Sequence, residues 1–166
     1  MIEQKIDEIF KILKKHDDRI KELEALAKGG QLKPVEVSLD QGIKKLAADA
    51  GITEEQLKHV FDFEEEDLNL IAAIEGNEAE KQCRATICIL TALDYCYGKD
   101  IIESKILRKK LEKLGISSLN NLSTNLAKFA NFIVPKGEPG SPNFCYKITL
   151  PGKKKGLEII RELASA

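Results

Sequence analysis

The sequence lacks tryptophan and has only two histidines, far in sequence from its four cysteines. Those cysteines, Cys83, Cys88, Cys96 and Cys145, form no Cys-x-x-Cys pair. A zinc site needs closely spaced pairs of ligands, so this pattern excludes the common zinc modules. We therefore interpret the cysteines as buried, reduced thiols, and we expect neither a metal nor a cofactor.

Long apolar runs and catalytic motifs are also missing. No stretch reaches the length of a transmembrane helix, and no charged and then apolar leader opens the chain. The glycines at 137–140 are interrupted by proline and lie between expected strands, so they do not form a phosphate-binding loop. No serine, histidine and carboxylate form a recognisable nucleophile motif. We expect a cytoplasmic protein without a membrane partner and without enzymatic activity.

The net charge of −1 conceals two halves of opposite sign. Residues 1–80 contain 11 Lys and Arg against 20 Asp and Glu, whereas residues 81–166 contain 15 against 7. The basic half is therefore the candidate for binding a polyanion. Alternatively, the two halves partly neutralise each other within one molecule, and charge alone does not decide between these interpretations.

An unbroken heptad pattern occupies residues 1–28. Its core positions recur at alternating steps of four and three residues and are Ile2, Ile6, Ile9, Leu13, His16, Ile20 and Leu23. So narrow an apolar stripe predicts a coiled coil through which the protein self-associates as a dimer or a higher oligomer. Phe10, Ile12 and Leu26 widen the stripe, so packing of this helix on its own domain is the alternative.

A linker over 29–37, which contains Gly29-Gly30 and Pro34, separates this helix from an acidic segment over 38–76. Ala47, Gly51 and Leu57 have the spacing of a helix-turn-helix in that segment.

A capping box between Thr53 and Gln56 is expected to start the second of these helices. The four successive carboxylates at 64–67 would repel a phosphate backbone. We therefore interpret the acidic segment as a helical hairpin for packing or protein contacts. The pattern of residues 61–71 is compatible with a short β-hairpin or with helix ends.

The remaining residues, 77–166, predict three helices followed by two strands. The apolar spacing favours helices over 85–97, 103–114 and 119–130, the last of them capped by Ser117 or Ser118. Strands are expected over 132–135 and 144–150, joined by a loop rich in glycine and proline.

This order of elements resembles a winged helix-turn-helix domain, in which the third helix commonly enters the major groove of DNA. The resemblance implies base contacts from Asn121, Thr124, Asn125 and Lys128. It implies phosphate contacts from Ser117, Ser118, Lys105, Arg108 and Lys109, and wing contacts from Lys136 and Lys147.

The sequence thus predicts a mainly α protein with an N-terminal coiled-coil helix, a small helical segment and a C-terminal winged helix. We expect a self-associating protein that binds double-stranded DNA and regulates transcription. One alternative is a protein-interaction adaptor whose winged helix docks a protein without contacting DNA. Another is a regulator that senses a ligand in a pocket between the halves.

The heptad generates the first testable prediction. Light scattering of the full chain should give a multiple of the monomer mass, and deletion of residues 1–30 should reduce it to the monomer, because the deletion removes the proposed seam. An unchanged mass after the deletion would mean that the heptad packs internally.

Overall fold

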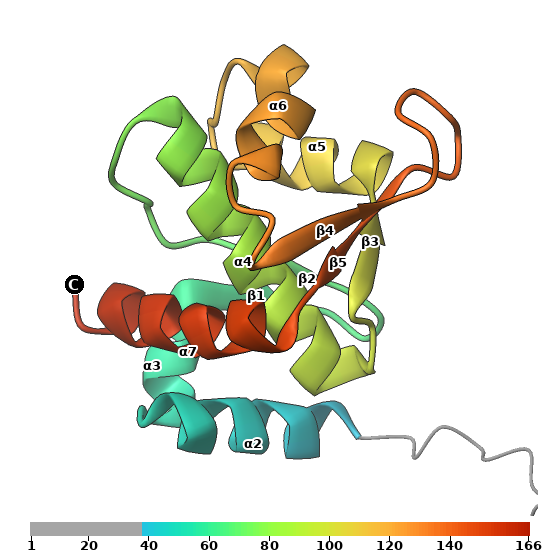
Figure 1. The fold of residues 1–166 in the computed structure, drawn as a ribbon. Helices are drawn as coiled ribbons and strands as arrows, with labels where there is room; N and C mark the ends of the chain where they lie inside the picture. The colour runs from blue at the N-terminus through green and yellow to red at the C-terminus, as the bar shows by residue number, and fades with distance from the viewer. Residues whose placement is uncertain (1–37) are drawn as a thin grey trace, which may run out of the picture. The chain divides into compact units, whose positions relative to one another are not determined.

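A computed structural model of the chain describes residues 38–166 (Figure 1). The predicted coiled coil, with all its oligomerisation residues, and the linker at 29–37 lie outside this part of the chain. Helices dominate the described residues, and two small antiparallel sheets accompany them, in agreement with a mainly α fold class. None of the helices between residues 38 and 166 combines the length and the apolar character needed to cross a bilayer.

The acidic segment begins with the helical hairpin that its sequence predicts. Helix α2 (Leu39–Ala50) ends at Gly51, whose φ of 70° is left-handed, and α3 (Glu54–Val60) follows. The expected capping box is confirmed, because Thr53 Oγ1 accepts from the Gln56 N–H at 3.1 Å and Gln56 Oε1 accepts from the Thr53 N–H at 2.9 Å.

Two short strands complete this segment. Strands β1 (Phe61–Phe63) and β2 (Leu68–Leu70) pair antiparallel. The stretch that the sequence left open is therefore a β-hairpin, with the four carboxylates of 64–67 at its turn.

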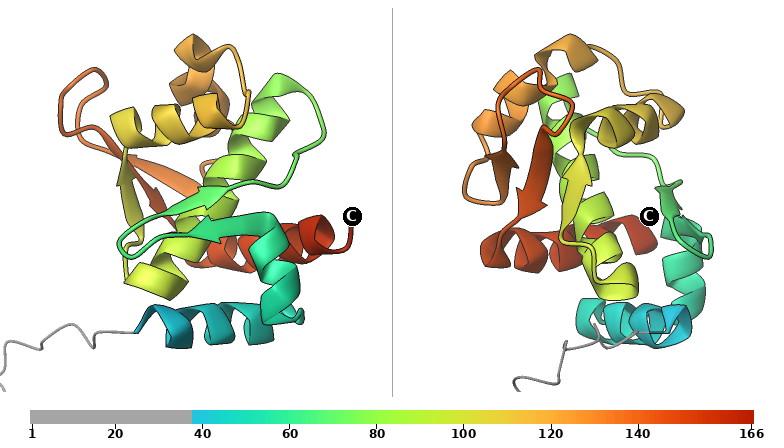
Figure 2. Two further views of the ribbon diagram at one scale, coloured as in Figure 1. Left: turned by 180° about the vertical axis from the view of Figure 1, so that it is seen from behind. Right: turned by 90° about the vertical axis from the view of Figure 1, so that its right-hand side faces the viewer.

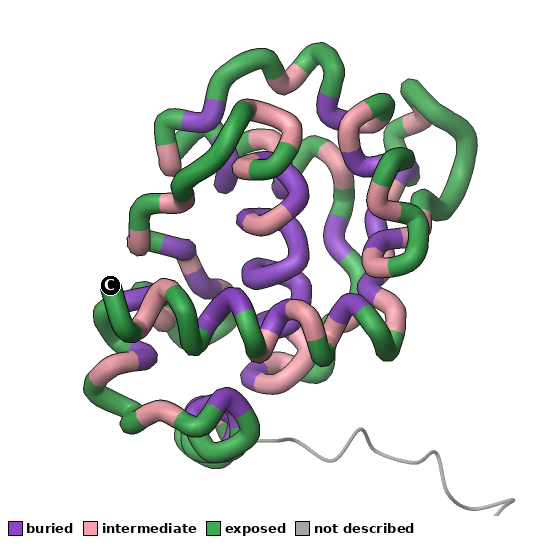
Figure 3. Tube along the Cα trace, turned by 60° about the vertical axis from the view of Figure 1, so that its left-hand side comes forward, coloured by how far each residue is buried: buried purple, intermediate pink, exposed green. Residues whose placement is uncertain are grey.

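Helix α4 (Glu78–Tyr97) runs through the middle of the described residues and is buried along most of its length (Figure 3). A capping box between Asn77 and Glu80 begins it, and Gly98, with a φ of 64°, ends it. The elements that follow are β3 (Ile101–Glu103), α5 (Ser104–Lys113), the 3-10 turn η1 (Leu119–Asn121), α6 (Leu122–Ala127), β4 (Ile133–Lys136), β5 (Cys145–Ile148) and α7 (Leu150–Ala164).

The second sheet has three strands rather than the two expected. Its order is β3-β5-β4, and both pairs are antiparallel, with Ile102 opposite Tyr146 and Val134 opposite Lys147. Strand β3 could not be predicted from the sequence, because it is three residues long and continues directly into α5. Such a short strand does not show the alternation of apolar and polar residues that identifies a strand.

The third helix is shorter than predicted and is not capped by a serine side chain. It starts as the 3-10 turn η1, and the Lys128 and Phe129 N–H groups donate to carbonyls only three residues back, which tightens and ends it. Ser118 stands at the start with a φ of 57° and makes no side-chain cap bond.

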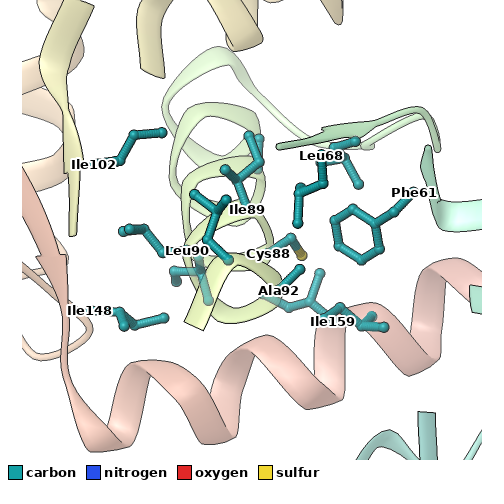
Figure 4. Packing of buried hydrophobic residues seen from close by; sticks show 14 of the residues in the cluster. Phe61, Leu68, Cys88, Ile89, Leu90, Ala92, Ile102, Ile148 and Ile159 are labelled. Carbon is teal, nitrogen blue, oxygen red and sulfur yellow. The ribbon is translucent and has the colours of Figure 1, made fainter. Parts of the chain in front are cut away.

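Residues 38–76 share one core with residues 77–166. Phe61 and Leu68 from the β1–β2 hairpin, Cys88 and Ala92 from α4, and Ile159 from α7 lie together (Figure 4). A Cβ on Gly42 of α2 would lie 2.6 Å from the Cα of Cys96, so α2 approaches α4 backbone to backbone. The acidic segment, interpreted from the sequence as a helical hairpin for packing or protein contacts, therefore has no core of its own.

Polar contacts also join the acidic segment to the basic half. Lys110 is buried, and its Nζ lies 2.7 and 2.6 Å from the two carboxylate oxygens of Asp67 and 2.6 Å from the Leu68 carbonyl oxygen. Tyr95 donates to the Asp49 carboxylate at 2.8 Å, and Arg161 Nε donates to the Ala50 carbonyl at 2.6 Å. Part of the charge asymmetry is thus neutralised inside the molecule.

The close contact at Gly42 generates a stability prediction. Gly42→Ala should lower the free energy of unfolding by about 1–3 kcal/mol, the usual cost of overpacking, although alanine is the better helix former. Urea unfolding followed by circular dichroism measures this change, and one core predicts a single transition. Gln41→Ala, at the exposed neighbouring position, is the matched control and should be close to neutral. An equal effect of the two changes would contradict the close packing of α2.

Candidate nucleic-acid interface

Helices α5 and α6 and the loop between β4 and β5 lie at the end of the domain opposite α2 (Figure 2). A groove of about 570 Å³ brings residues of all three together. Ser104, Lys105 and Arg108 of α5 line it, with Ser123 of α6 and the loop residues 140–142. This groove is where the structure places two of the predicted phosphate-binding residues.

The basic residues of the second half fall into two groups. Six of them form ion pairs with carboxylates of the described residues: Lys81, Arg84, Lys110, Lys147, Lys153 and Lys155. By contrast, Lys105, Lys109 and Lys136 are exposed, and none of them has an ion-pair partner within residues 38–166. Lys128 is exposed as well and reaches only the Asn125 amide oxygen, at 3.5 Å. Nine basic residues of this half therefore have no ion pair within residues 38–166: six lie on α5, on the residue after α6 and on the β4–β5 hairpin, and the other three are Lys99, Lys154 and Arg161.

Arg108 connects the two helices of this interface. Its guanidinium donates to the carbonyl oxygen of Leu119, at the start of η1, and the side chain also lines the groove. The same residue therefore fixes the entry to α6 and contributes positive charge to the groove.

Gln82 holds the turn between α5 and α6 from inside the domain. This α4 residue is fully buried, and its Nε2 donates to the carbonyl oxygens of Ser117 at 2.9 Å and Ser118 at 3.3 Å. Its Oε1 accepts from Nδ2 of Asn125 at 3.0 Å. Because Ser118 has a left-handed φ that costs free energy outside glycine, the turn needs such support from its surroundings.

Three of the predicted contact residues are engaged within the protein. Asn125 points to Gln82, so its amide is not free to pair with a base edge. The Ser117 N–H and Oγ both donate to Glu78, at 3.1 and 2.9 Å. Lys147 pairs with Asp100 at 2.9 Å and lines a separate hollow of the sheet with Lys136, away from the groove.

The other predicted base contacts remain accessible. Asn121, Thr124 and Lys128 are exposed along η1, α6 and the turn after it. Ser118 is exposed too, although its backbone is held by Gln82. The interface thus keeps three of the four residues that the winged-helix resemblance implies for base contacts.

Two residues that shape this region were not identified from the sequence. Ser123 lines the groove, and its Oγ lies 2.8 Å from the hydroxyl of the buried Tyr146. Gln82 occupies the buried face of α4, four residues before Thr86 and seven before Ile89. An amide side chain on a face made mainly of apolar residues and threonine is the signal that could have identified it.

Three of the four cysteines are buried thiols of the core. Cys83, Cys88 and Cys96 are free and buried in α4, and Cys145 is half-buried in β5. Burial raises the pKa of the Cys83 and Cys96 thiols to about 12 and that of Cys88 further, so all three stay protonated at neutral pH. No group of three metal-ligating side chains converges anywhere between residues 38 and 166.

The Gln82 contacts generate a prediction. Gln82→Leu should lower the free energy of unfolding by about 2 kcal/mol or more, because two backbone carbonyls and the Asn125 amide lose their buried partner. Denaturant unfolding measures the loss, and hydrogen exchange should show it as faster exchange at residues 116–126. Gln41→Leu, at an exposed site of α2, controls for the change of side chain. Equal stability of the two variants would remove Gln82 from this structural role.

No family model, no curated protein and no solved structure matches this chain.

Proposed function

We propose that residues 77–166 form a winged helix-turn-helix domain that binds double-stranded DNA. Support comes from the order α4, β3, α5, α6, β4, β5, in which three helices precede a hairpin and β3 pairs with its second strand. The observation that carries the proposal is electrostatic. Of the nine basic residues of this half without an ion-pair partner among the described residues, six lie on α5, on the residue after α6 and on the β4–β5 hairpin, and two of the six, Lys105 and Arg108, line the groove.

In this proposal, α6 and its flanks face the major groove. Asn121 can make a bidentate contact with adenine, and Thr124 and Lys128 extend the same face. Lys105, Arg108 and Lys109 contact phosphates, with Lys136 as a further contact from the hairpin. Because Lys128 is the one basic residue on this face of α6 and its flanks, phosphate contacts dominate the affinity, and binding depends strongly on salt.

Self-association completes the proposal. A coiled coil over residues 1–28 would bring two such domains together, double the phosphate contacts and favour paired sites on DNA. The protein would then act as a cytoplasmic transcriptional regulator.

The adaptor remains the second candidate because of one apolar surface. Ile101 and Ile106 are 42% and 43% exposed, and both line a second groove of about 650 Å³ beside the edge strand β3. An exposed apolar pair next to a free strand edge is typical of protein docking rather than of DNA contact.

Anisotropy titrations of the full chain against mixed-sequence duplex DNA at several salt concentrations separate the two candidates. DNA binding predicts an affinity that falls linearly on a log–log plot against salt, with a slope reduced by about one for each phosphate-contacting lysine removed. Lys105→Gln and Lys109→Gln should each weaken binding in this way. Lys154→Gln, an equal charge change at an exposed site of α7, should not.

Failure to bind DNA even at low salt would refute the DNA-binding proposal and favour the adaptor. Equal losses from Lys105→Gln and Lys154→Gln would mean that binding responds to net charge and not to this interface.

A further inference from the structure

A pocket on the domain lies against the turn that precedes α6. It has a volume of about 600 Å³ and is lined by residues 69–74, by Lys81 of α4 and by residues 113–116, which join α5 to η1. Pockets of this size commonly hold small organic ligands. Residues of the acidic segment and of the proposed helix-turn-helix of the basic half thus line the same pocket.

One wall of the pocket is apolar and exposed to solvent. Ile71 is 54% exposed, although its N–H and that of Ala72 both donate to the Val60 carbonyl oxygen, at 2.9 and 3.3 Å. The backbone therefore fixes an isoleucine at the surface, where its exposure costs free energy unless something covers it.

The charges of the lining are all positive. Lys81 and Lys113 both line the pocket, and none of the described residues that line it carries a carboxylate. The nearest partners of these lysines are weak ones. Lys81 lies 3.9 Å from Glu78, and Lys113 lies 3.4 Å from the Asn69 amide oxygen. Two cations beside an apolar wall complement a molecule with an anionic head and an apolar body.

We propose that this pocket binds a small amphipathic carboxylate. Lys81 and Lys113 bind the carboxylate, and Ile71, Ile74 and Leu114 contact the apolar part of the ligand. The ligand also regulates α6, because residues 113–116 lead directly into the turn at Ser117 and Ser118 that Gln82, the neighbour of Lys81, holds. This regulatory part depends on the DNA-binding function proposed above, whereas the binding site itself does not.

Calorimetric titration of the full chain with octanoate, octylamine and 1-octanol tests the site. Octanoate should bind saturably, the neutral alcohol more weakly, and the cationic amine not at all. Lys81→Met and Lys113→Met should each weaken octanoate binding about tenfold or more, the effect of losing one charge-assisted hydrogen bond. Ile71→Ser should weaken it as well, whereas the control Lys154→Met should leave it unchanged.

Three results would overturn the proposal. The first is the absence of saturable octanoate binding up to about 5 mM, a concentration that would detect even weak affinity. The second is binding of octylamine equal to that of octanoate, and the third is an unchanged octanoate affinity in both lysine variants. Anisotropy titrations with and without octanoate then test regulation, with a change in DNA affinity of about fivefold or more expected. A chain that binds octanoate but not DNA would refute the DNA proposal alone. A chain that binds both without coupling would refute regulation and leave the site.

Discussion

The burial of α4 is the constraint on which the rest of the described structure depends. A helix that is buried along most of its length needs apolar or small surfaces on every side, and no single partner supplies them. Helices α2, α6 and α7 and both sheets share this task, and two of the contacts require glycine. Gly42 meets the backbone of Cys96, and Gly156 of α7 meets Thr91, where a Cβ would collide with the side chain. The acidic segment therefore belongs to the fold of the basic half and is not an appendage to it.

Buried polar side chains then position the elements of the candidate interface. Gln82 holds the turn before α6, and Lys110 ties α5 to the β1–β2 hairpin through Asp67. Both belong to elements whose other buried residues are mostly apolar, and both have their hydrogen-bonding capacity met by named partners. Leaving such groups unpaired would cost free energy, so these contacts favour the arrangement of elements in which both are satisfied.

Features encoded by neighbouring residues could be predicted from the sequence. The capping box at Thr53, the left-handed glycine at Gly51 and the hairpin of β4 and β5 depend on residues a few positions apart. Features that depend on distant partners could not. Nothing in the sequence near Lys110 indicates that it pairs with Asp67. Likewise, nothing near Gln82 indicates that it accepts a hydrogen bond from the Asn125 amide. For the same reason, the sequence indicated that residues 81–166 are basic but could not separate the paired lysines from the unpaired ones.

The close packing of α2 against α4 has a mechanical consequence. Helix α2 is the first described element after the linker, so any force transmitted along the chain from its N-terminal part enters the domain there. Sliding α2 along α4 would move Gly42 away from its close contact with the backbone of Cys96. Such a backbone-to-backbone contact resists shear better than a contact between flexible side chains. Within residues 38–166, the helices α5 and α6 of the candidate interface lie at the end of the domain opposite this contact.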